Sequence, residues 1–318
     1  MTSSVRHRAT APGGIGNLGP GLDVLGCAVA GVRDEVTAQW SEARGLTLLD
    51  PGHAELPNEP ARHTAAIAAT AVIALVRRRG VTLRGPGVAL TAKKGLPLSG
   101  GQGGSAASAV AGATAVNALL GGSLDTGDLL ACCLDAEAKV SGRHLDNIAS
   151  ALLGGIVLVR SLDPIEVVLL PVPTGLHLVL ALPAQRLSTA RSRSALPPTA
   201  TQAVMTHQMA QVAALVAACY TNDLAMFGRS LDDRYAEPAR APLLPGFLAA
   251  KRAAMDAGAL GASISGAGPS AFAITSDAGA AAEVAHAMTA AYTSEGIECT
   301  TRVTTVDPDG AIITEVRP

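Results

Sequence analysis

Aromatic side chains are scarce in this chain, since phenylalanine, tryptophan and tyrosine together make up 2% of its 318 residues. Single-stranded nucleic acids usually bind by stacking their bases on aromatic rings. The 24 basic and 26 acidic residues are interspersed, so no basic stripe is present to attract a polyanion. No apolar run approaches the ~20 residues of a membrane-spanning helix. We therefore expect neither a nucleic-acid partner nor a membrane partner.

Cysteine is also infrequent, and the five cysteines form no CxxC pair. Their odd number and scattered spacing favour reduced thiols over disulfides. Cys132 and Cys133 are neighbours in an apolar helical pattern, where burial is favoured over metal binding because adjacent side chains on a helix point in different directions. The opening residues, "MTSSVRHRATAPGG", lack the apolar segment of a secretory signal. These features predict a cytoplasmic protein.

Helical and strand-like patterns alternate along both halves of the chain, which is typical of α/β and α+β proteins. The spacing predicts short strands between 22 and 49 with turns at Gly31 and Gly45, and a helix near 61–79 with Asn58 as its cap. Further helices are expected at 105–120, 125–140, 202–220, 222–233, 246–257 and 280–292. Further strands are expected at 87–94, 154–161, 165–172, 177–183, 262–265, 270–275, 299–306 and 311–316. The length favours two domains that meet around residues 160–180.

The stretch "GLPLSGGQGGSAASA", residues 95–109, places a glycine-rich turn directly before a predicted helix. Such a turn offers free backbone N–H groups and the positive end of a helix dipole, where phosphate can bind. A Walker loop is excluded because Gly95 through Gly101 is followed by Gln102, so the lysine of GxxxxGK[ST] is missing. Gly101, Gly103 and Ala106 satisfy a dinucleotide fingerprint, with Asp125 at a suitable distance, but residues 97–99 separate the glycines from the strand. Glycines that only permit close helix packing are a further alternative.

The third kind of phosphate site is the Pro-x-x-x-Gly-x-Gly-Ser-Ser-Ala-Ala loop of the GHMP small-molecule kinases, which "PLSGGQGGSAAS" resembles. Two more segments resemble motifs of that family in the same order, "APGGIGNLGPGLDVLG" at 11–26 and "SISGAGPSAFAI" at 263–274. Within the family, "AEAKVSGRHLDNIASALLGGIVLVRS" resembles the His-x-Asp-Asn segment of the homoserine kinases. "LSTARSRSALP" and "YAEPARAPLLPGF" resemble their two arginine segments.

The resemblance implies an α+β protein with the GHMP kinase fold. It implies a ribosomal protein S5 domain 2-like domain in residues 1–170, a ferredoxin-like domain in residues 171–318, and a homodimer. The activity it implies is ATP-dependent phosphorylation of L-homoserine to O-phospho-L-homoserine for threonine biosynthesis, with Mg2+. The alternatives are a GHMP kinase for another small alcohol, such as mevalonate or shikimate, and a non-catalytic binding protein on the same fold.

By the same resemblance, ATP is expected to contact the glycine-rich loop, namely Pro97, Leu98, Ser99, Gly100, Gly101, Gln102, Gly103, Gly104, Ser105, Ala106 and Ala107. A hydroxyl and a carboxylate suit a magnesium ion that bridges phosphates, and Ser105 and Glu137 are the candidates. Glu137 could instead be an ordinary carboxylate on a helix surface. Lys93 and Lys94 precede the loop and could approach phosphate, but we expect them to be solvated lysines at the end of a strand.

Homoserine is a zwitterion with a primary alcohol, so its site needs an anion for the ammonium and a forked cation for the carboxylate. The resemblance assigns the first task to Asn17 and Asp23 and the second to Arg193 and Arg240. The other residues that it places at the substrate are Thr189, His144, Asn147 and Gly266, with Asp146 as a candidate base. As alternatives, Asp23 could be a turn residue, His144 a structural histidine, and each arginine part of a surface ion pair.

Two departures from the family pattern bear on these expectations. Gln102 replaces the usual leucine of the loop and Gly104 replaces its first serine, so one hydroxyl is lost. Backbone N–H groups can still bind phosphate, because glycine keeps its amide. The segment "GGIGNLG" replaces the usual Thr-Ser-Ala-Asn and removes small polar side chains near Asn17.

Overall fold

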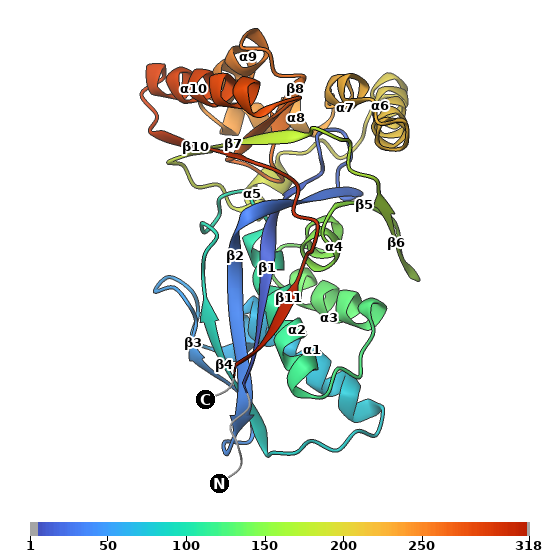
Figure 1. Cartoon of the computed structure of the whole chain (residues 1–318), viewed down its shortest axis with the longest axis vertical. Helices are drawn as coiled ribbons and strands as arrows, with labels where there is room; N and C mark the ends of the chain where they lie inside the picture. Colours follow the sequence, from blue (N-terminus) through green and yellow to red (C-terminus); the bar gives the residue numbers. More distant parts are fainter. Residues whose placement is uncertain (1–5, 317–318) are drawn as a thin grey trace.

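A computed structural model describes residues 6–316, which fold into two β-sheets with helices packed against each (Figure 1). The first sheet consists of β1 (Arg6–Gly16), β2 (Leu25–Ser41), β3 (Gly45–Asp50), β4 (Gly87–Lys93), β5 (Ile156–Leu162), β6 (Ile165–Leu170) and β11 (Ile312–Val316). Its main path runs β11-β1-β2-β4-β3, while β5 pairs with β2 and β6 pairs with β5. Only the β3–β4 pair is parallel among these strands.

The first sheet is covered by a layer of four helices, seen beside it in Figure 1. They are α1 (Thr64–Arg78), α2 (Gly104–Leu119), α3 (Thr126–Ala138) and α4 (Asp146–Leu153), with a short 3₁₀ helix at Pro60–Arg62 before α1. Most of α2 is buried and consists of alanine, valine and other small residues. At Gly112 of α2 an added Cβ would lie 2.5 Å from the carbonyl oxygen of Ala65. Small residues therefore let α1 and α2 approach closely, and the core needs few aromatic rings.

The second sheet is antiparallel, with strand order β10-β7-β9-β8. It consists of β7 (His177–Pro183), β8 (Gly261–Ile264), β9 (Ala271–Thr275) and β10 (Cys299–Thr304). Figure 1 shows its helices at the same end of the molecule, with α9 and α10 on one side and α6 and α7 on the other. These are α6 (Gln202–Thr221), α7 (Leu224–Arg229), α9 (Phe247–Asp256) and α10 (Ala278–Ser294); α5 (Thr189–Ser194), α8 (Ala236–Arg240) and a 3₁₀ turn at Ala241–Leu243 are short.

The last strand does not stay with the second sheet. β11 returns along the molecule to pair with β1, so both ends of the described chain lie together at the edge of the first sheet (Figure 1). The second sheet begins at β7, after the expected domain boundary of 170/171, which stays a prediction. The helices and mainly antiparallel sheets confirm the α+β class.

Most of the elements expected from periodicity are present, but two details were wrong. Gly31 is not a turn between strands, because it lies inside β2, where its φ of 105° accompanies a register shift against β1. Asn58 does not cap the first long helix, whose N-cap is His63, because a 3₁₀ turn comes before it. The pattern also missed β1 and the short helices α4, α5 and α8.

The predictions of reduced thiols and of no membrane-spanning helix can be compared with residues 6–316. All five cysteines are buried thiols without a disulfide in residues 6–316, which confirms the expected packing of Cys132 and Cys133. Burial raises the pKa of the Cys132 thiol to about 11. Across residues 6–316, we find no helix with the length and apolar character needed to cross a membrane. The predicted absence of a secretory signal partly concerns residues 1–5, which lie outside the described residues.

Candidate active site

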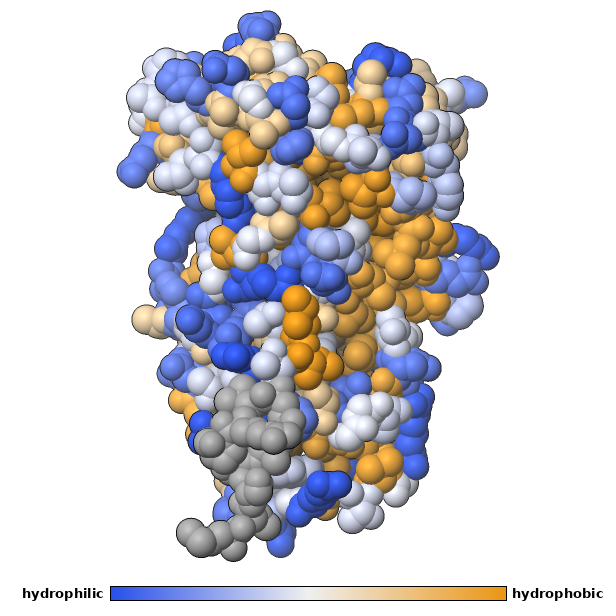
Figure 2. All heavy atoms as spheres, viewed as in Figure 1, coloured by the Kyte–Doolittle hydropathy of each residue, from blue (hydrophilic) through white to orange (hydrophobic). Residues whose placement is uncertain are grey.

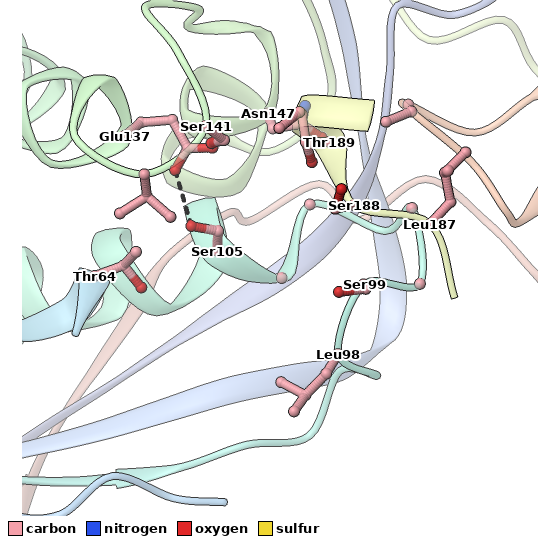
Figure 3. A pocket seen from close by; sticks show the side chains of 18 of the residues that line it. Thr64, Leu98, Ser99, Ser105, Glu137, Ser141, Asn147, Leu187, Ser188 and Thr189 are labelled. Atoms are coloured by element: carbon pink, nitrogen blue, oxygen red, sulfur yellow. Dashed lines mark hydrogen bonds between the residues drawn. The ribbon is translucent and has the colours of Figure 1, made fainter. Parts of the chain in front are cut away.

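A cavity of about 500 Å3 lies where the loop before α2 faces segments that follow β7 and β8. Figure 3 shows hydroxyl, carboxyl and amide side chains that line it, from α1, the loop, α2, α3, α4 and α5. Of the expected site residues, those lining the cavity are Asn17, Asp23, Pro97, Leu98, Ser99, Gly100, Gly101, Gly103, Gly104, Ser105, Glu137, His144, Asp146, Asn147, Thr189, Arg193, Arg240 and Gly266. Segments far apart in the sequence therefore share one site.

The glycine-rich loop ends in a left-handed residue that starts α2. Gly103 is the N-cap of α2 with a φ of 64°, and an added Cβ would lie 2.6 Å from the side-chain oxygen of Asn147. The first-turn N–H groups of a helix have no intrahelical acceptor, so those of α2 are available to a phosphate beside the loop. Gln102, Ala106 and Ala107 belong to the same stretch but are not among the residues that line the cavity. Gln102 is buried and accepts a hydrogen bond from Arg302.

The three glycine motifs of the sequence meet at this loop. The hydroxyl of Ser265 donates to the carbonyl of Gly101 at 2.8 Å. The N–H of Gly266 donates to the carbonyl of Gly16 at 3.2 Å, and the carbonyl of Gly266 accepts from the side chain of Asn17 at 3.0 Å. The phosphate loop, the first motif and the last motif are thus held together by hydrogen bonds between segments of both sheets.

Ser105 and Glu137 meet across the cavity wall. The Ser105 hydroxyl donates to the Glu137 carboxylate at 3.0 Å (Figure 3), and Ser141 donates to its second oxygen. Glu137 is only 4% exposed, so it is not the surface carboxylate offered as an alternative. A carboxylate and a hydroxyl offer the oxygen ligands that Mg2+ prefers.

A second group of possible metal ligands lies in the same cavity. One ligand atom each from Asp23, His144 and Asp146 lies within 4.8 Å of the others. This group contains an imidazole, and its Asp23 is already paired with an arginine. Mg2+ prefers oxygen ligands, so the pair of Ser105 and Glu137 suits that ion better.

Asp23 and Arg193 form a bidentate ion pair inside the cavity. The two guanidinium nitrogens donate to the two carboxylate oxygens at 2.9 and 2.7 Å. Burial acts to raise the pKa of Asp23, but the hydrogen bonds and charge of Arg193 lower it below its usual value. Asp23 has a φ of 62° and donates its N–H to the side-chain oxygen of Asn17, so it is also a turn residue. The turn therefore aims this carboxylate at Arg193.

Arg240 lies beside this pair and is 3% exposed. One guanidinium nitrogen donates to the carbonyl of Gly266 at 3.0 Å, while its Nε has no hydrogen-bond partner among residues 6–316. Burial, together with the nearby charge of Arg193, lowers the pKa of Arg240. Neither Arg193 nor Arg240 is the simple surface ion pair considered as an alternative, because both reach the cavity.

The His-x-Asp-Asn segment brings three more polar groups to the cavity at the start of α4. The Asp146 carboxylate accepts the N–H of Asn17 at 3.1 Å, and its second oxygen lies 3.6 Å from Nδ1 of His144. Burial acts to lower the pKa of His144, but the Asp146 carboxylate raises it above its usual value. Asn147 donates to Asp146 at 3.3 Å, and Thr189 reaches the cavity from the first turn of α5.

Some residues of the cavity carried little signal in the sequence. Lys94 was expected to be solvated, but it is buried and its ammonium donates to the carbonyl of Gly104 at 2.6 Å and to the hydroxyl of Ser108 at 3.0 Å. Ser141, which donates to Glu137, was missed because no motif marks it. Asp125, the acid of the dinucleotide alternative, instead caps α3 by accepting the N–H of Asp128 at 2.9 Å.

Comparison with known proteins assigns both halves of the chain to the same family. Residues 65–155 match the family model described as GHMP kinases N terminal domain, and residues 215–294 match the one described as GHMP kinases C terminal. A homoserine kinase of Chlorobium phaeobacteroides is 38% identical, with 88% of this chain and 90% of that protein aligned. One from Arabidopsis thaliana is 40% identical, with 85% of this chain and 74% of that protein aligned.

A solved structure extends this likeness to the fold. The crystal structure of homoserine kinase from Cytophaga hutchinsonii superposes with a TM-score of 0.91 at 37% identity, covering 99% of this chain and 98% of that one. This superposition confirms the fold that the glycine motifs implied.

Proposed function

Because the chain belongs to the homoserine kinases of the GHMP kinase family, we propose that it transfers the γ-phosphoryl group of ATP to the hydroxyl of L-homoserine. The product is O-phospho-L-homoserine, an intermediate for threonine. The observation that carries the proposal is the placement of the Asp23–Arg193 pair in one cavity with a phosphate-type loop. A zwitterion and a nucleotide can therefore bind side by side.

The ion pair suits an amino acid because a zwitterion can insert into it. The substrate carboxylate binds the guanidinium fork of Arg193, with Arg240 beside it. The substrate ammonium binds Asp23 and the side-chain oxygen of Asn17. One ion pair is exchanged for two, and no charge is left unpaired. Mevalonate and shikimate lack the ammonium and would leave the carboxylate of Asp23 without a partner. This difference in the pairing of Asp23 supports an amino acid as the substrate over the other small alcohols.

Phosphoryl transfer depends mainly on positioning and charge neutralisation. A bond forms between the homoserine hydroxyl oxygen and the γ-phosphorus, and the bond from that phosphorus to the bridging oxygen of ADP breaks. The loop and the start of α2 hold the phosphates, while Thr189 and Asn147 orient the hydroxyl. Ser105 and Glu137 would hold Mg2+, which supplies charge neutralisation at the β- and γ-phosphates when bound.

We propose that the Asp146 carboxylate accepts the hydroxyl proton, with the support that its Oδ1 is buried and has no hydrogen-bond donor within the described residues. Asp146→Asn should then lower kcat by about 10²-fold or more, the usual contribution of a general base. Steady-state assays with saturating ATP and homoserine measure this. Retention of most of kcat would assign the proton to a γ-phosphate oxygen instead.

We also propose that the protein is a homodimer that uses the apolar surface around β6. Figure 2 shows hydrophobic surface on the side where Figure 1 places β5 and β6. Among the described strands, β6 pairs only with β5, and the exposed apolar residues on and near it and on α6 include Val168, Leu169, Val172, Met205 and Met209. A second copy would cover both the free strand edge and these side chains.

Leu169→Glu should convert the dimer to a monomer, because Leu169 is 54% exposed on β6 and a charge there would have to be desolvated in the interface. Size-exclusion chromatography with light scattering measures the mass. Ile313→Glu is the matched control, since Ile313 is 51% exposed on β11 at another edge of the same sheet. A monomeric wild type, or dissociation by the control alone, would contradict the proposed surface.

For the compartment, we propose a reducing one such as the cytoplasm. The support is that all five cysteines are buried thiols without a disulfide in the described chain.

The proposed function is tested by measuring ADP release with L-homoserine, mevalonate and shikimate offered separately, together with MgATP binding by calorimetry. Turnover with homoserine at a kcat/KM well above the other two is the expected result. Preference for another alcohol would place the chain with a different GHMP kinase activity. Binding of MgATP without turnover of any alcohol would favour the non-catalytic alternative.

A further inference from the structure

Asp34 is a buried carboxylate that lies outside the cavity but is linked to the phosphate loop. It lies on β2, is 1% exposed, and is not among the residues that line the cavity. Its Oδ1 accepts the backbone N–H groups of Gly95 and Leu96 at 3.1 and 3.0 Å. Its Oδ2 accepts the hydroxyl of Ser108 at 2.6 Å and the ammonium of Lys94. Four donors thus converge on one side chain.

These donors lie on both sides of the phosphate loop. Lys94, Gly95 and Leu96 lead into the loop, and Ser108 lies in α2 just after it. A single carboxylate on β2 therefore ties the beginning of the loop to the helix that ends it. Lys94 makes a second connection of the same kind, because its ammonium donates to the hydroxyl of Ser108 at 3.0 Å.

Lys94 extends the connection to the first turn of α2. Its ammonium donates to the carbonyl of Gly104 at 2.6 Å as well as to Asp34. A Cβ added at Gly104 would lie 2.9 Å from this nitrogen. The lysine thus fills the space beside Gly104, the position where the family loop usually has serine. The absence of a side chain at Gly104 therefore leaves the space that the buried lysine fills.

We propose that Asp34 is a positioning residue for the phosphate loop, which it holds in its nucleotide-binding conformation through Lys94 and the N–H groups of Gly95 and Leu96. This inference rests on the proposed function only in taking the loop as the ATP site. Donors that are fixed in advance need no reorganisation when an anion binds. Asparagine at position 34 would place an N–H₂ group or a neutral oxygen against the ammonium, leaving its charge buried without a counterion.

The test compares Asp34→Asn with Asp307→Asn, a control of matched chemistry. Asp307 is 5% exposed and does not line the cavity. Its carboxylate accepts hydrogen bonds from the guanidinium of Arg33 and from two backbone N–H groups, those of Asp309 at 3.1 Å and Gly310 at 3.0 Å. Both variants therefore lose a buried carboxylate that pairs with a cation and accepts hydrogen bonds from two backbone N–H groups. Only the carboxylate of Asp34 holds the phosphate loop.

Asp34→Asn should raise the Kd of MgATP by about 10-fold or more, comparable with the loss of a group that orients a metal ligand, while the KM for homoserine changes little. Asp307→Asn should lower the urea midpoint of unfolding without changing the Kd of MgATP. Calorimetry with MgATP alone measures the Kd, so this test stands even if homoserine proves not to be the acceptor. If Asp34→Asn folds and binds MgATP like wild type, or if the two variants weaken MgATP equally, the proposal is overturned.

Ser108→Ala is a second variant in case the asparagine variant does not fold. It removes one donor to Asp34 and one acceptor for Lys94, but it keeps both charges. Its Kd for MgATP should rise by a smaller factor, about threefold, as expected for the loss of a modest hydrogen bond. An unchanged Kd in Ser108→Ala would also count against the proposal.

Discussion

Arg193→Met is expected to lower kcat/KM for L-homoserine by about 10²- to 10³-fold. The guanidinium of Arg193 forms two hydrogen bonds to Asp23 in the cavity, and it is the fork that the substrate carboxylate would take. The two side chains are 35% and 36% exposed in the free protein, so the loss should arise in the complex, where the substrate carboxylate would lose two hydrogen bonds to a charged group, each contributing about 1.5–3 kcal/mol. Most of the loss should appear in KM, since this contact is made in the ground state as well as in the transition state.

Two controls make this expectation specific. Arg191→Met changes an exposed arginine of the same short helix, α5, which does not line the cavity, and it should leave the kinetics unchanged. 3-Aminopropan-1-ol has the ammonium and hydroxyl of homoserine but no carboxylate, so its poor turnover should change little in Arg193→Met. Equal losses with both substrates, or wild-type kinetics with homoserine, would show that Arg193 does not bind the carboxylate.

Glu137→Gln is expected to lower kcat by about 10²- to 10³-fold, comparable with the removal of one preorganised group that stabilises transition-state charge. The Mg2+ concentration for half-maximal activity should rise in the same variant. The physical reason is that glutamine keeps the shape and can still accept from Ser105 but lacks the negative charge that holds a divalent cation. Titrations of activity with Mg2+ at fixed, saturating ATP and homoserine measure both effects.

Asp135→Asn is the matched control for this variant, because Asp135 is an exposed acid on the same helix, α3, and does not line the cavity. It should leave the Mg2+ requirement unchanged. Asp23→Asn separates the two candidate metal sites, since it removes a carboxylate from the group of Asp23, His144 and Asp146. A raised Mg2+ requirement in Asp23→Asn but not in Glu137→Gln would place the ion at that group.

Much of the fold could be predicted because its signals are local. The helix expected at 105–120 is α2 over Gly104–Leu119, and the strand expected at 177–183 is β7. Each has a run of residues with one periodicity, long enough to be recognised without its neighbours. The short helices α4, α5 and α8 were missed because five to eight residues do not establish a helical period. The pattern predicts a turn at Gly31, where β2 has a bulge instead, because glycine is favoured in turns and in bulges alike.

The candidate site could be predicted where motifs carry it. Most of the loop lines the cavity, together with Asn17, Asp23, His144, Asp146, Asn147 and both arginines, while Gln102, Ala106 and Ala107 of the loop do not. Their roles in binding and catalysis stay predictions for the variants above. Lys94 was expected to be solvated, because a lysine at the end of a strand usually is. Its burial depends on Asp34, which lies 60 residues earlier in the chain and belongs to no motif.

The sequence by itself determined the family, the phosphate loop and most of the helices and strands, because these depend on neighbouring residues. Only the tertiary structure decided which charges meet. Asp23 and Arg193 are 170 residues apart, and Asp34 reaches the loop from β2. Such pairs are set by how strands and helices pack, and a carboxylate carries no local mark of the cation that it will contact. The side of the loop that faces ATP is therefore visible in the sequence, while the carboxylate that holds the loop from behind is not.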